Sequence, residues 1–155
     1  KDYGHILKDD PAYSNKAARV SELANDVSEV FEPLLDAHLA QHPLNKKPHK
    51  TIAFHCPCTL QHGQQLSGSV ERILEKLGYA VPAVADSHLC CGSAGTYSLL
   101  QPELSQQLLK NKLKNLEAED PDEIVTANIG CQLHLASGTE RSVKHWIELI
   151  EHQLG

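Results

Sequence analysis

Apolar residues between positions 14 and 42 recur at intervals of three and four, the spacing of one face of an amphipathic helix. This face consists of Val20, Leu23, Ala24, Val27, Val30, Phe31, Leu34 and Leu35. Asp26 followed by Glu29 resembles a capping box, so we expect a break near residue 26 that divides the stretch into two helices. A polar connector over residues 42–49 follows. We therefore predict an N-terminal helical extension or linker over residues 1–48 and a second domain over residues 49–155.

Beyond the connector, short runs typical of buried strands alternate with segments of helical spacing. The predicted strands are 51–55, 80–85 and 124–129, and the predicted helices are 66–77, ending at Gly78, and 103–117. A further amphipathic helix is expected at the C-terminus, with His145 and Trp146 on it. Strands that alternate with helices form βαβ units. The predicted fold class is α/β, with a small parallel sheet of βαβ units flanked by helices and preceded by the helical extension.

Four cysteines follow the predicted strands. Cys58 comes after the first strand, the adjacent pair Cys90 and Cys91 after the second, and Cys131 after the third. Gaps of 31 residues (59–89) and 39 residues (92–130) separate them, so the thiols come from three loops. Because the carboxyl ends of parallel strands gather functional groups at one edge of a sheet, we expect these loops to converge.

Thiolates gathered in this way favour a soft metal centre, either an iron–sulfur cluster or zinc. A disulfide framework fits poorly, because the chain has five cysteines and adjacent cysteines bridge each other only with strain. Two further alternatives are packing of the cysteines as small apolar residues and a nucleophilic cysteine activated by His88 or His55. Metal binding accounts best for adjacent thiols.

The glycines beside the cysteines also have a physical role. Gly92, Gly95 and Gly130 let the backbone approach a bulky centre closely and turn N–H groups toward sulfur. The stretch from Gly92 to Gly95 is alternatively a phosphate loop, but no Gly-Lys-Ser/Thr sequence follows it.

Cys56 and the histidines leave several assignments open. Cys56 precedes Cys58 by two positions, and a structural role for it is as consistent with the sequence as metal ligation. Five of the ten histidines lie near the cysteine loops: His55, His62, His88, His134 and His145. A loop histidine is more often a hydrogen-bond partner than a ligand. We expect His134 to be the exception, because it follows Cys131 with two residues between them, a common spacing of metal ligands.

Composition excludes two classes of partner. The chain has 155 residues, of which 41% are hydrophobic, enough to bury one core with an appendage. Its net charge of −6 and its scattered Lys and Arg residues argue against a nucleic-acid partner. We find no apolar run of about 18 residues, so we expect no membrane span.

Four segments together resemble a known family. They read PCTLQH at 57–62, VADSHLCCGSAGTY at 84–97, TANIGC at 126–131 and VKHWIEL at 143–149. They are similar to the cysteine-rich CCG domains of heterodisulfide reductase and of the iron–sulfur subunits of glycolate oxidase, anaerobic glycerol-3-phosphate dehydrogenase and lactate-utilisation proteins. The resemblance is greatest to the glycolate oxidase subunits, with residues 3–19 similar to the linker helix before their C-terminal domain.

The resemblance implies an iron–sulfur site and an electron-transfer role. By this analogy Cys58, Cys90, Cys91 and Cys131 bind a cluster, expected to be 4Fe-4S, with zinc as the alternative. The family pattern ends in Cys-x-x-Cys, whereas this chain has His134 at the last position. His134 or Cys56 is therefore an optional replacement ligand, and a mixed thiolate and imidazole site also suits zinc.

The resemblance also implies partners. The chain carries no convincing dinucleotide fingerprint, so hydride transfer from glycolate to form glyoxylate is expected on flavin-binding subunits of an oxidase complex. The chain would pass electrons to a quinone or another respiratory acceptor without a catalytic acid or base of its own. We expect a cytoplasmic location, at the inner membrane face through partners. The alternative is a structural docking module, zinc-bound or metal-free, that uses the apolar face of residues 14–42.

Overall fold

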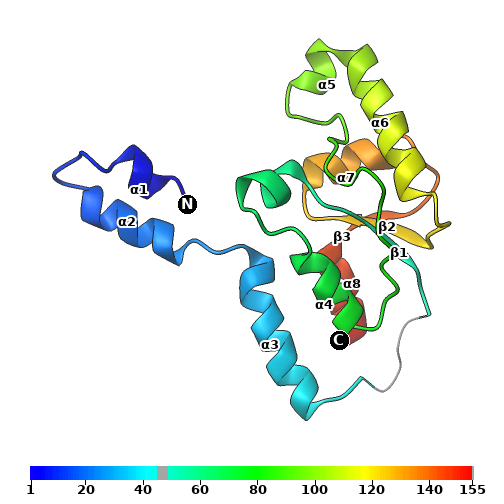
Figure 1. The fold of residues 1–155 in the computed structure, drawn as a ribbon, viewed down its shortest axis with the longest axis horizontal. Coiled ribbons are helices and arrows are strands. Elements are labelled where there is room, and N and C mark those ends of the chain that lie inside the picture. Colours follow the sequence, from blue (N-terminus) through cyan, green and yellow to red (C-terminus); the bar gives the residue numbers. More distant parts are fainter. Residues whose placement is uncertain (45–48, 155) are drawn as a thin grey trace. The chain divides into compact units, whose positions relative to one another are not determined.

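The computed structural model describes residues 1–44 and 49–154 (Figure 1). The chain divides into two compact units, Lys1–Pro43 and Leu44–Gly155. The boundary predicted between residues 48 and 49 adjoins residues 45–48, which lie outside the described residues, and it stays a prediction.

The first unit is helical, and the predicted break within it is confirmed. It contains α1 (Tyr3–Ile6), α2 (Ser14–Leu23) and α3 (Val27–Gln41). Asp26 caps α3: its carboxylate accepts from the Ser28 backbone N–H at 3.0 Å, and the Glu29 carboxylate accepts from the Asp26 N–H at 2.7 Å. These two bonds complete the capping box, which satisfies N–H groups that have no partner inside the helix.

Most of the apolar face predicted on these helices is exposed. Leu35 is buried, but five residues of the face are exposed: Val20, Leu23, Val27, Val30 and Leu34. A run of exposed apolar side chains at helical spacing is an unusual surface for a helical segment. The pattern therefore identified the helices correctly, but within the described residues it did not mark a buried face.

The second unit is built on a parallel three-stranded sheet, which confirms the predicted α/β class. Its strands are β1 (Ile52–His55), β2 (Glu123–Thr126) and β3 (Val143–His145), in the spatial order β1-β2-β3. His55 pairs in register with Thr126, and Thr126 pairs with His145. The carboxyl ends of all three strands thus reach the same edge of the sheet.

Two of the predicted elements around this sheet were wrong. Residues 80–85 form no strand, and only one parallel bridge joins Ala80 to Thr51. Pro82 lacks an N–H donor, so the ladder cannot continue through it. The third strand is instead β3, which contains His145, a residue expected from the sequence to lie on the C-terminal helix. That helix, α8, begins one residue later and spans Trp146–Leu154.

The other helices of the second unit agree better with the sequence pattern. Helix α4 (Ser69–Lys76) lies inside the predicted 66–77, and α6 (Pro102–Leu116) matches the predicted 103–117. The remaining elements were not predicted: the π-helix η1 (Thr59–Gly63), α5 (Tyr97–Leu100) and α7 (Ile129–Ala136). Gly78 has φ of +91°, consistent with its predicted place after the end of α4.

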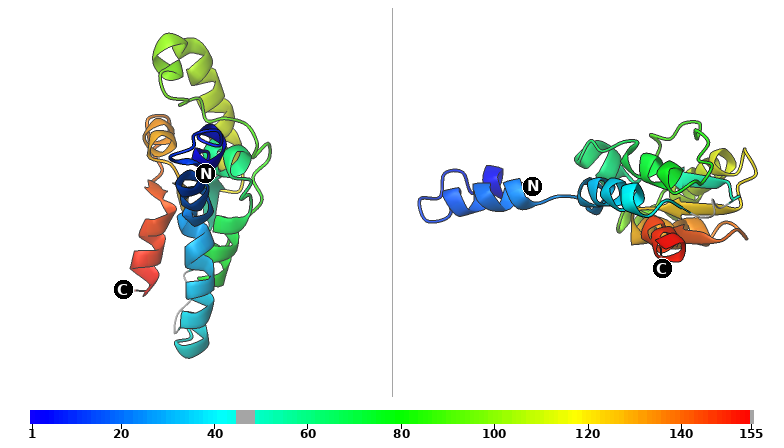
Figure 2. Two further views of the ribbon diagram at one scale, coloured as in Figure 1. Left: turned by 90° about the vertical axis from the view of Figure 1, so that its left-hand side faces the viewer. Right: turned by 90° about the horizontal axis from the view of Figure 1, so that it is seen from below.

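Helices cover the sheet from both sides. Leu109, Leu113 and Leu116 of α6 and Leu135 of α7 pack with Ala53 and Ile124 of the sheet. Helices α4 and α8 lie on the opposite side of the sheet from α6 and α7 (Figures 1 and 2). Cys91 belongs to the α6–α7 core cluster, so the cysteine loop is anchored in the core. Among the described residues, no helix has the length and apolarity needed to cross a membrane.

Candidate metal centre

The four predicted cysteines line one pocket of about 510 Å³ at the carboxyl edge of the sheet. Cys58 follows β1 and immediately precedes η1, Cys90 and Cys91 lie on the loop before α5, and Cys131 lies in the first turn of α7. The predicted convergence of three segments is confirmed, although the segment before Cys90 is not a strand and Cys131 is on a helix. Metal binding by these residues stays a prediction.

The pocket has a buried and an open side. Cys91 is 1% exposed, Cys90 and Cys131 are half-buried, and Cys58 is exposed. All five cysteines of the chain are free thiols, so no disulfide competes for them. A bound group would therefore be held from the core side by Cys91 and Cys131 and reached from outside past Cys58.

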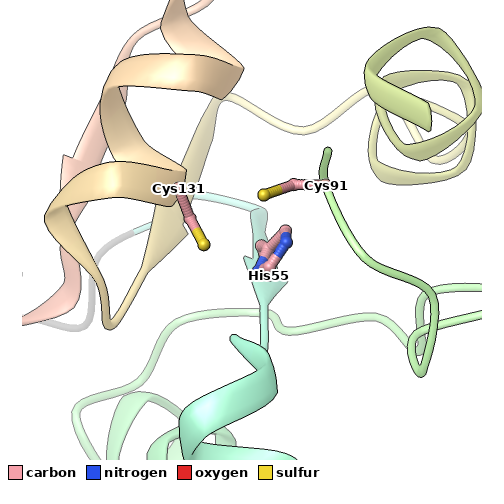
Figure 3. A group of neighbouring side chains, drawn as sticks. All are labelled: His55, Cys91 and Cys131. Atoms are coloured by element: carbon pink, nitrogen blue, oxygen red, sulfur yellow. The ribbon is translucent and has the colours of Figure 1, made fainter. Parts of the chain in front are cut away.

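The sequence interpretation placed His55 near the cysteine loops but did not assign it as a ligand. Its imidazole and the sulfurs of Cys91 and Cys131 have their potential ligand atoms within 4.8 Å of one another. Figure 3 shows the two sulfurs and the ring turned toward a common space, from α7, the cysteine loop and the end of β1. In the sequence, the signal for a role of His55 was a histidine at the end of an apolar strand. The structure buries every position of this strand, and a buried imidazole needs a polar partner.

The two buried thiols influence each other strongly. A hydrogen bond with Cys131 lowers the pKa of Cys91 to about 4, and the nearby His55 ring adds to this effect against the opposing effect of burial. The pKa of Cys131 is raised, because its proton is held against the Cys91 sulfur and burial disfavours a second thiolate. The pair thus carries one negative charge and one proton, and a metal bound to both sulfurs must displace that proton.

A lysine from α6 lies behind the cysteine loop. The Lys112 side chain is 3% exposed, and its ammonium donates to the Asp86 carbonyl at 2.9 Å and to the Ser87 carbonyl at 3.2 Å. Burial lowers the pKa of Lys112, and the negative charges of Cys91 and Cys58 oppose that shift. A buried cation is thus near the thiols and fixes the segment that leads to them.

Backbone groups shape the same loop. The Gly92 N–H donates to the Cys90 sulfur at 3.3 Å, and the Asn128 side chain accepts from the Cys131 N–H at 3.1 Å as the cap of α7. Gly92 has φ of +98°, and a Cβ at this position would lie 2.4 Å from the Ser105 carbonyl oxygen. Only glycine fits there, which gives a physical reason for the glycine that follows the cysteine pair.

His134 and Cys56 lie outside the pocket lining. The His134 Nε2 is 3.2 Å from the Ser105 hydroxyl, which donates to the Gly92 carbonyl at 2.8 Å. His134 is therefore a hydrogen-bond partner behind the cysteine loop, and its predicted role as a ligand stays a prediction. Cys56 is buried and lines a separate pocket of about 300 Å³, and burial raises its pKa to about 12. The choice between a structural role and metal ligation for Cys56 stays open.

The donor set suits a soft metal. Four thiols line the pocket. The His55 imidazole is not part of the lining but lies within 4.8 Å of the Cys91 and Cys131 sulfurs, and its two nitrogens are buried without a hydrogen-bond partner of normal geometry among the described residues. Thiolate and imidazole ligands select zinc and iron–sulfur centres over hard cations. The residues that form the pocket therefore fit either group.

Comparison with known proteins identifies similar sequences. Residues 52–136 match the family described as CCG, cysteine-rich domain. The chain is 53% identical, over 99% of its length, to the glycolate oxidase iron-sulfur subunit of Escherichia coli (strain K12), of which it spans 37%. It is 33% identical, over 90% of its length, to the probable glycolate oxidase iron-sulfur subunit of Bacillus subtilis (strain 168), of which it spans 31%. Lactate utilization protein A of Shouchella clausii is 26% identical, and the chain spans 59% of that protein.

Proposed function

We propose, because this chain belongs to the CCG cysteine-rich domain family, that it binds an iron–sulfur cluster and relays electrons within the iron–sulfur subunit of a glycolate oxidase complex. The observation that carries this proposal is the convergence of Cys58, Cys90, Cys91 and Cys131 on one pocket. The name of the similar Escherichia coli protein, with 53% identity over nearly the whole chain, supports the choice of complex.

The pocket has room for a cluster, with a volume of about 510 Å³. A cluster bound by these thiolates supplies one-electron transfer, which suits a relay between a two-electron substrate oxidation and a respiratory acceptor. The expected type is 4Fe-4S.

The residues of the chain have supporting roles in this proposal. The four cysteines hold the cluster as thiolates, and the Gly92 N–H donates toward the Cys90 sulfur, an interaction that tunes a thiolate ligand. Cys91 and Cys131 place the cluster against the core, and Cys58 leaves one side open for electron exchange with partners. No acid or base is assigned, because the domain carries out no proton or hydride transfer.

The substrate chemistry belongs to the partners. Oxidation of glycolate to glyoxylate takes place on flavin-binding subunits, and the relay delivers the electrons to a quinone or another respiratory acceptor. The complex lies in the cytoplasm, with contact to the inner face of the membrane through those partners. The domain is part of a multi-subunit oxidoreductase and is not catalytic alone.

A second candidate function is a zinc-bound or metal-free docking module of the same complex. The exposed apolar residues of α2 and α3, among them Leu23, Val27 and Leu34, favour a contact with another protein surface. A protein contact through these helices does not exclude a cluster in the second unit. The two candidate functions therefore differ only in the metal content of the protein.

The test is reconstitution of the anaerobically purified protein with iron and sulfide, followed by elemental analysis, absorption and EPR spectroscopy. We expect stoichiometric iron and sulfide and a reducible EPR signal, and we expect Cys90→Ser and Cys91→Ser to lose most of the bound iron. Cys56→Ala is the matched control, because Cys56 lies outside the pocket lining, and it should keep the cluster. Zinc or no metal in the wild-type protein would favour the docking module.

A further inference from the structure

We propose that His55 is a nitrogen ligand of the metal centre, next to Cys91 and Cys131. Where the centre is a cluster, the inference deepens the proposed function and rests on it, and the three side chains bind iron atoms of that cluster. Where the centre is a single zinc ion, the same three side chains bind that one ion. The cysteine pattern assigns no role to His55, because His55 is the last residue of β1 and comes before Cys58, the first cysteine of the pocket.

The first argument is distance. The potential ligand atoms of the three residues all lie within 4.8 Å of one another. Two ligands on one tetrahedral metal lie about 3.5–3.8 Å apart, given bond lengths near 2.3 Å to sulfur and 2.0–2.1 Å to nitrogen. An adjustment of at most about 1.3 Å brings these three atoms to the separations of ligands on one metal ion. Figure 3 shows that the two sulfurs and the ring face the same space.

The second argument is the state of the imidazole. His55 is 3% exposed, and neither Nδ1 nor Nε2 has a hydrogen-bond partner of normal geometry among the described residues. The Cys91 and Cys131 sulfurs lie within 4.8 Å of its ligand atom. A buried polar group left without a partner destabilises the folded protein. A bond to a metal satisfies one of the two nitrogens, and in most ligating histidines the other nitrogen donates to a carboxylate, a carbonyl or water.

The third argument is the neighbouring side chain. Thr126 is the residue of β2 in register with His55, and its buried hydroxyl likewise has no hydrogen-bond partner among the described residues. Residues in register on adjacent parallel strands point to the same face of a sheet. Two adjacent unsatisfied polar groups therefore lie at the carboxyl edge of the sheet, beside the buried thiols, where a bound group would satisfy at least one of them.

His134 is less suited to the same role. Its Nε2 is already 3.2 Å from the Ser105 hydroxyl, and it does not belong to the group of mutually close ligand atoms. His55 therefore supplies the ligand that the cysteine pattern lacks at its end. The family pattern has a cysteine at the position of His134. With the neutral His55 imidazole in place of that thiolate, the cluster carries one negative charge less than with the family's full cysteine set, which favours its reduction.

The decisive experiment measures nitrogen bound to the cluster. The protein is produced with ¹⁵N-labelled histidine, reconstituted with iron and sulfide, reduced, and examined by pulsed EPR. We expect a strong ¹⁵N hyperfine coupling in the wild-type protein and in His134→Ala, and its loss in His55→Ala. A coupling that persists in His55→Ala, or that disappears in His134→Ala, would overturn the proposal, as would a loaded wild-type cluster without a strong ¹⁵N coupling.

A second variant covers the case in which His55→Ala does not fold. His55→Cys provides a thiolate at the same position and should bind iron and sulfide at the wild-type stoichiometry without the ¹⁵N coupling. If His55→Cys retains the coupling, another histidine is the ligand and the inference is wrong.

A third measurement separates this inference from the proposed function. If the wild-type protein takes up no iron and sulfide, the proposed function fails, and Co²⁺ then serves as the probe of a zinc-type site. His55→Ala should bind Co²⁺ at least about tenfold more weakly than wild type, and His134→Ala should bind it unchanged. Equal Co²⁺ affinity of His55→Ala and wild type would overturn the role of His55 independently of any cluster.

Discussion

At the scale of single residues, identical side chains have opposite properties in this protein. Cys91 and Cys56 are both buried, yet the pKa of Cys91 is lowered to about 4 and that of Cys56 is raised to about 12. Cys91 has Cys131 and His55 beside it, whereas desolvation dominates at Cys56. The surroundings of a cysteine, more than its burial, therefore determine how readily its thiol loses a proton.

Gly92 gives a residue-scale prediction. In Gly92→Ala the new Cβ would lie 2.4 Å from the Ser105 carbonyl oxygen at a φ of +98°, so the loop carrying Cys90 and Cys91 must move. We expect the free energy of unfolding to fall by about 3 kcal/mol, together with a loss of metal content. Chemical denaturation and metal analysis measure the two effects.

Gly95→Ala is the control for this substitution. Gly95 also has a positive φ, of +60°, but a Cβ at this position meets nothing within 4 Å. Only the backbone preference is lost, at a cost of about 1 kcal/mol. Equal effects of the two substitutions would mean that backbone conformation, not the contact with Ser105, explains the glycine at position 92.

At the scale of elements, α6 supports the cysteine loop from the core side. Its leucines pack on the sheet, its Ser105 hydroxyl donates to the Gly92 carbonyl, and its Lys112 ammonium donates to two carbonyls before the cysteine pair. One helix thus contributes packing, a hydrogen bond and a buried positive charge. The loop depends on this helix more than on a strand, which is consistent with the absence of a ladder over residues 80–85.

Lys112→Met tests the electrostatic part of this support. Methionine keeps much of the length of the side chain but removes the positive charge and both hydrogen bonds. We expect the reduction potential of the reconstituted centre to fall by an amount on the order of 50 mV, because a partly buried charge interaction is worth about 1 kcal/mol or more. Redox titration followed by EPR measures the shift.

Lys110→Met is the matched control, because Lys110 is on the same helix but exposed. It should leave the potential unchanged. A Lys112→Met protein that binds the cluster at the wild-type potential would limit Lys112 to holding Asp86 and Ser87 in place.

At the scale of the whole molecule, every residue of the candidate centre belongs to the unit Leu44–Gly155. We therefore expect a fragment of residues 44–155 to bind metal at the stoichiometry of the full chain. The same fragment with Cys91→Ser serves as the negative control. A fragment that is folded by circular dichroism but takes up no iron, zinc or Co²⁺ would mean that the first unit contributes to the centre.

The sequence by itself determined the local features of this protein. Helical spacing, the Asp26–Glu29 capping box and the place of Gly78 depend on neighbouring residues, so α3, α4, α6 and the strands β1 and β2 were predicted within a few positions. The four pocket cysteines were also found, because thiols on loops that follow strands are read directly from the order of elements.

The tertiary structure alone decided the features that depend on distant residues. Strand β3 has three residues, too few for a periodic signal, and it exists because it pairs with β2. The sequence showed Pro82 but did not show whether residues 80–85 pair with a neighbouring strand. In the structure only Ala80 forms a bridge, to Thr51. His55 approaches Cys91 and Cys131 because β1, the cysteine loop and α7 meet at one edge of the sheet. The sequence placed five histidines near the cysteine loops, and only the tertiary structure singled out His55 among them.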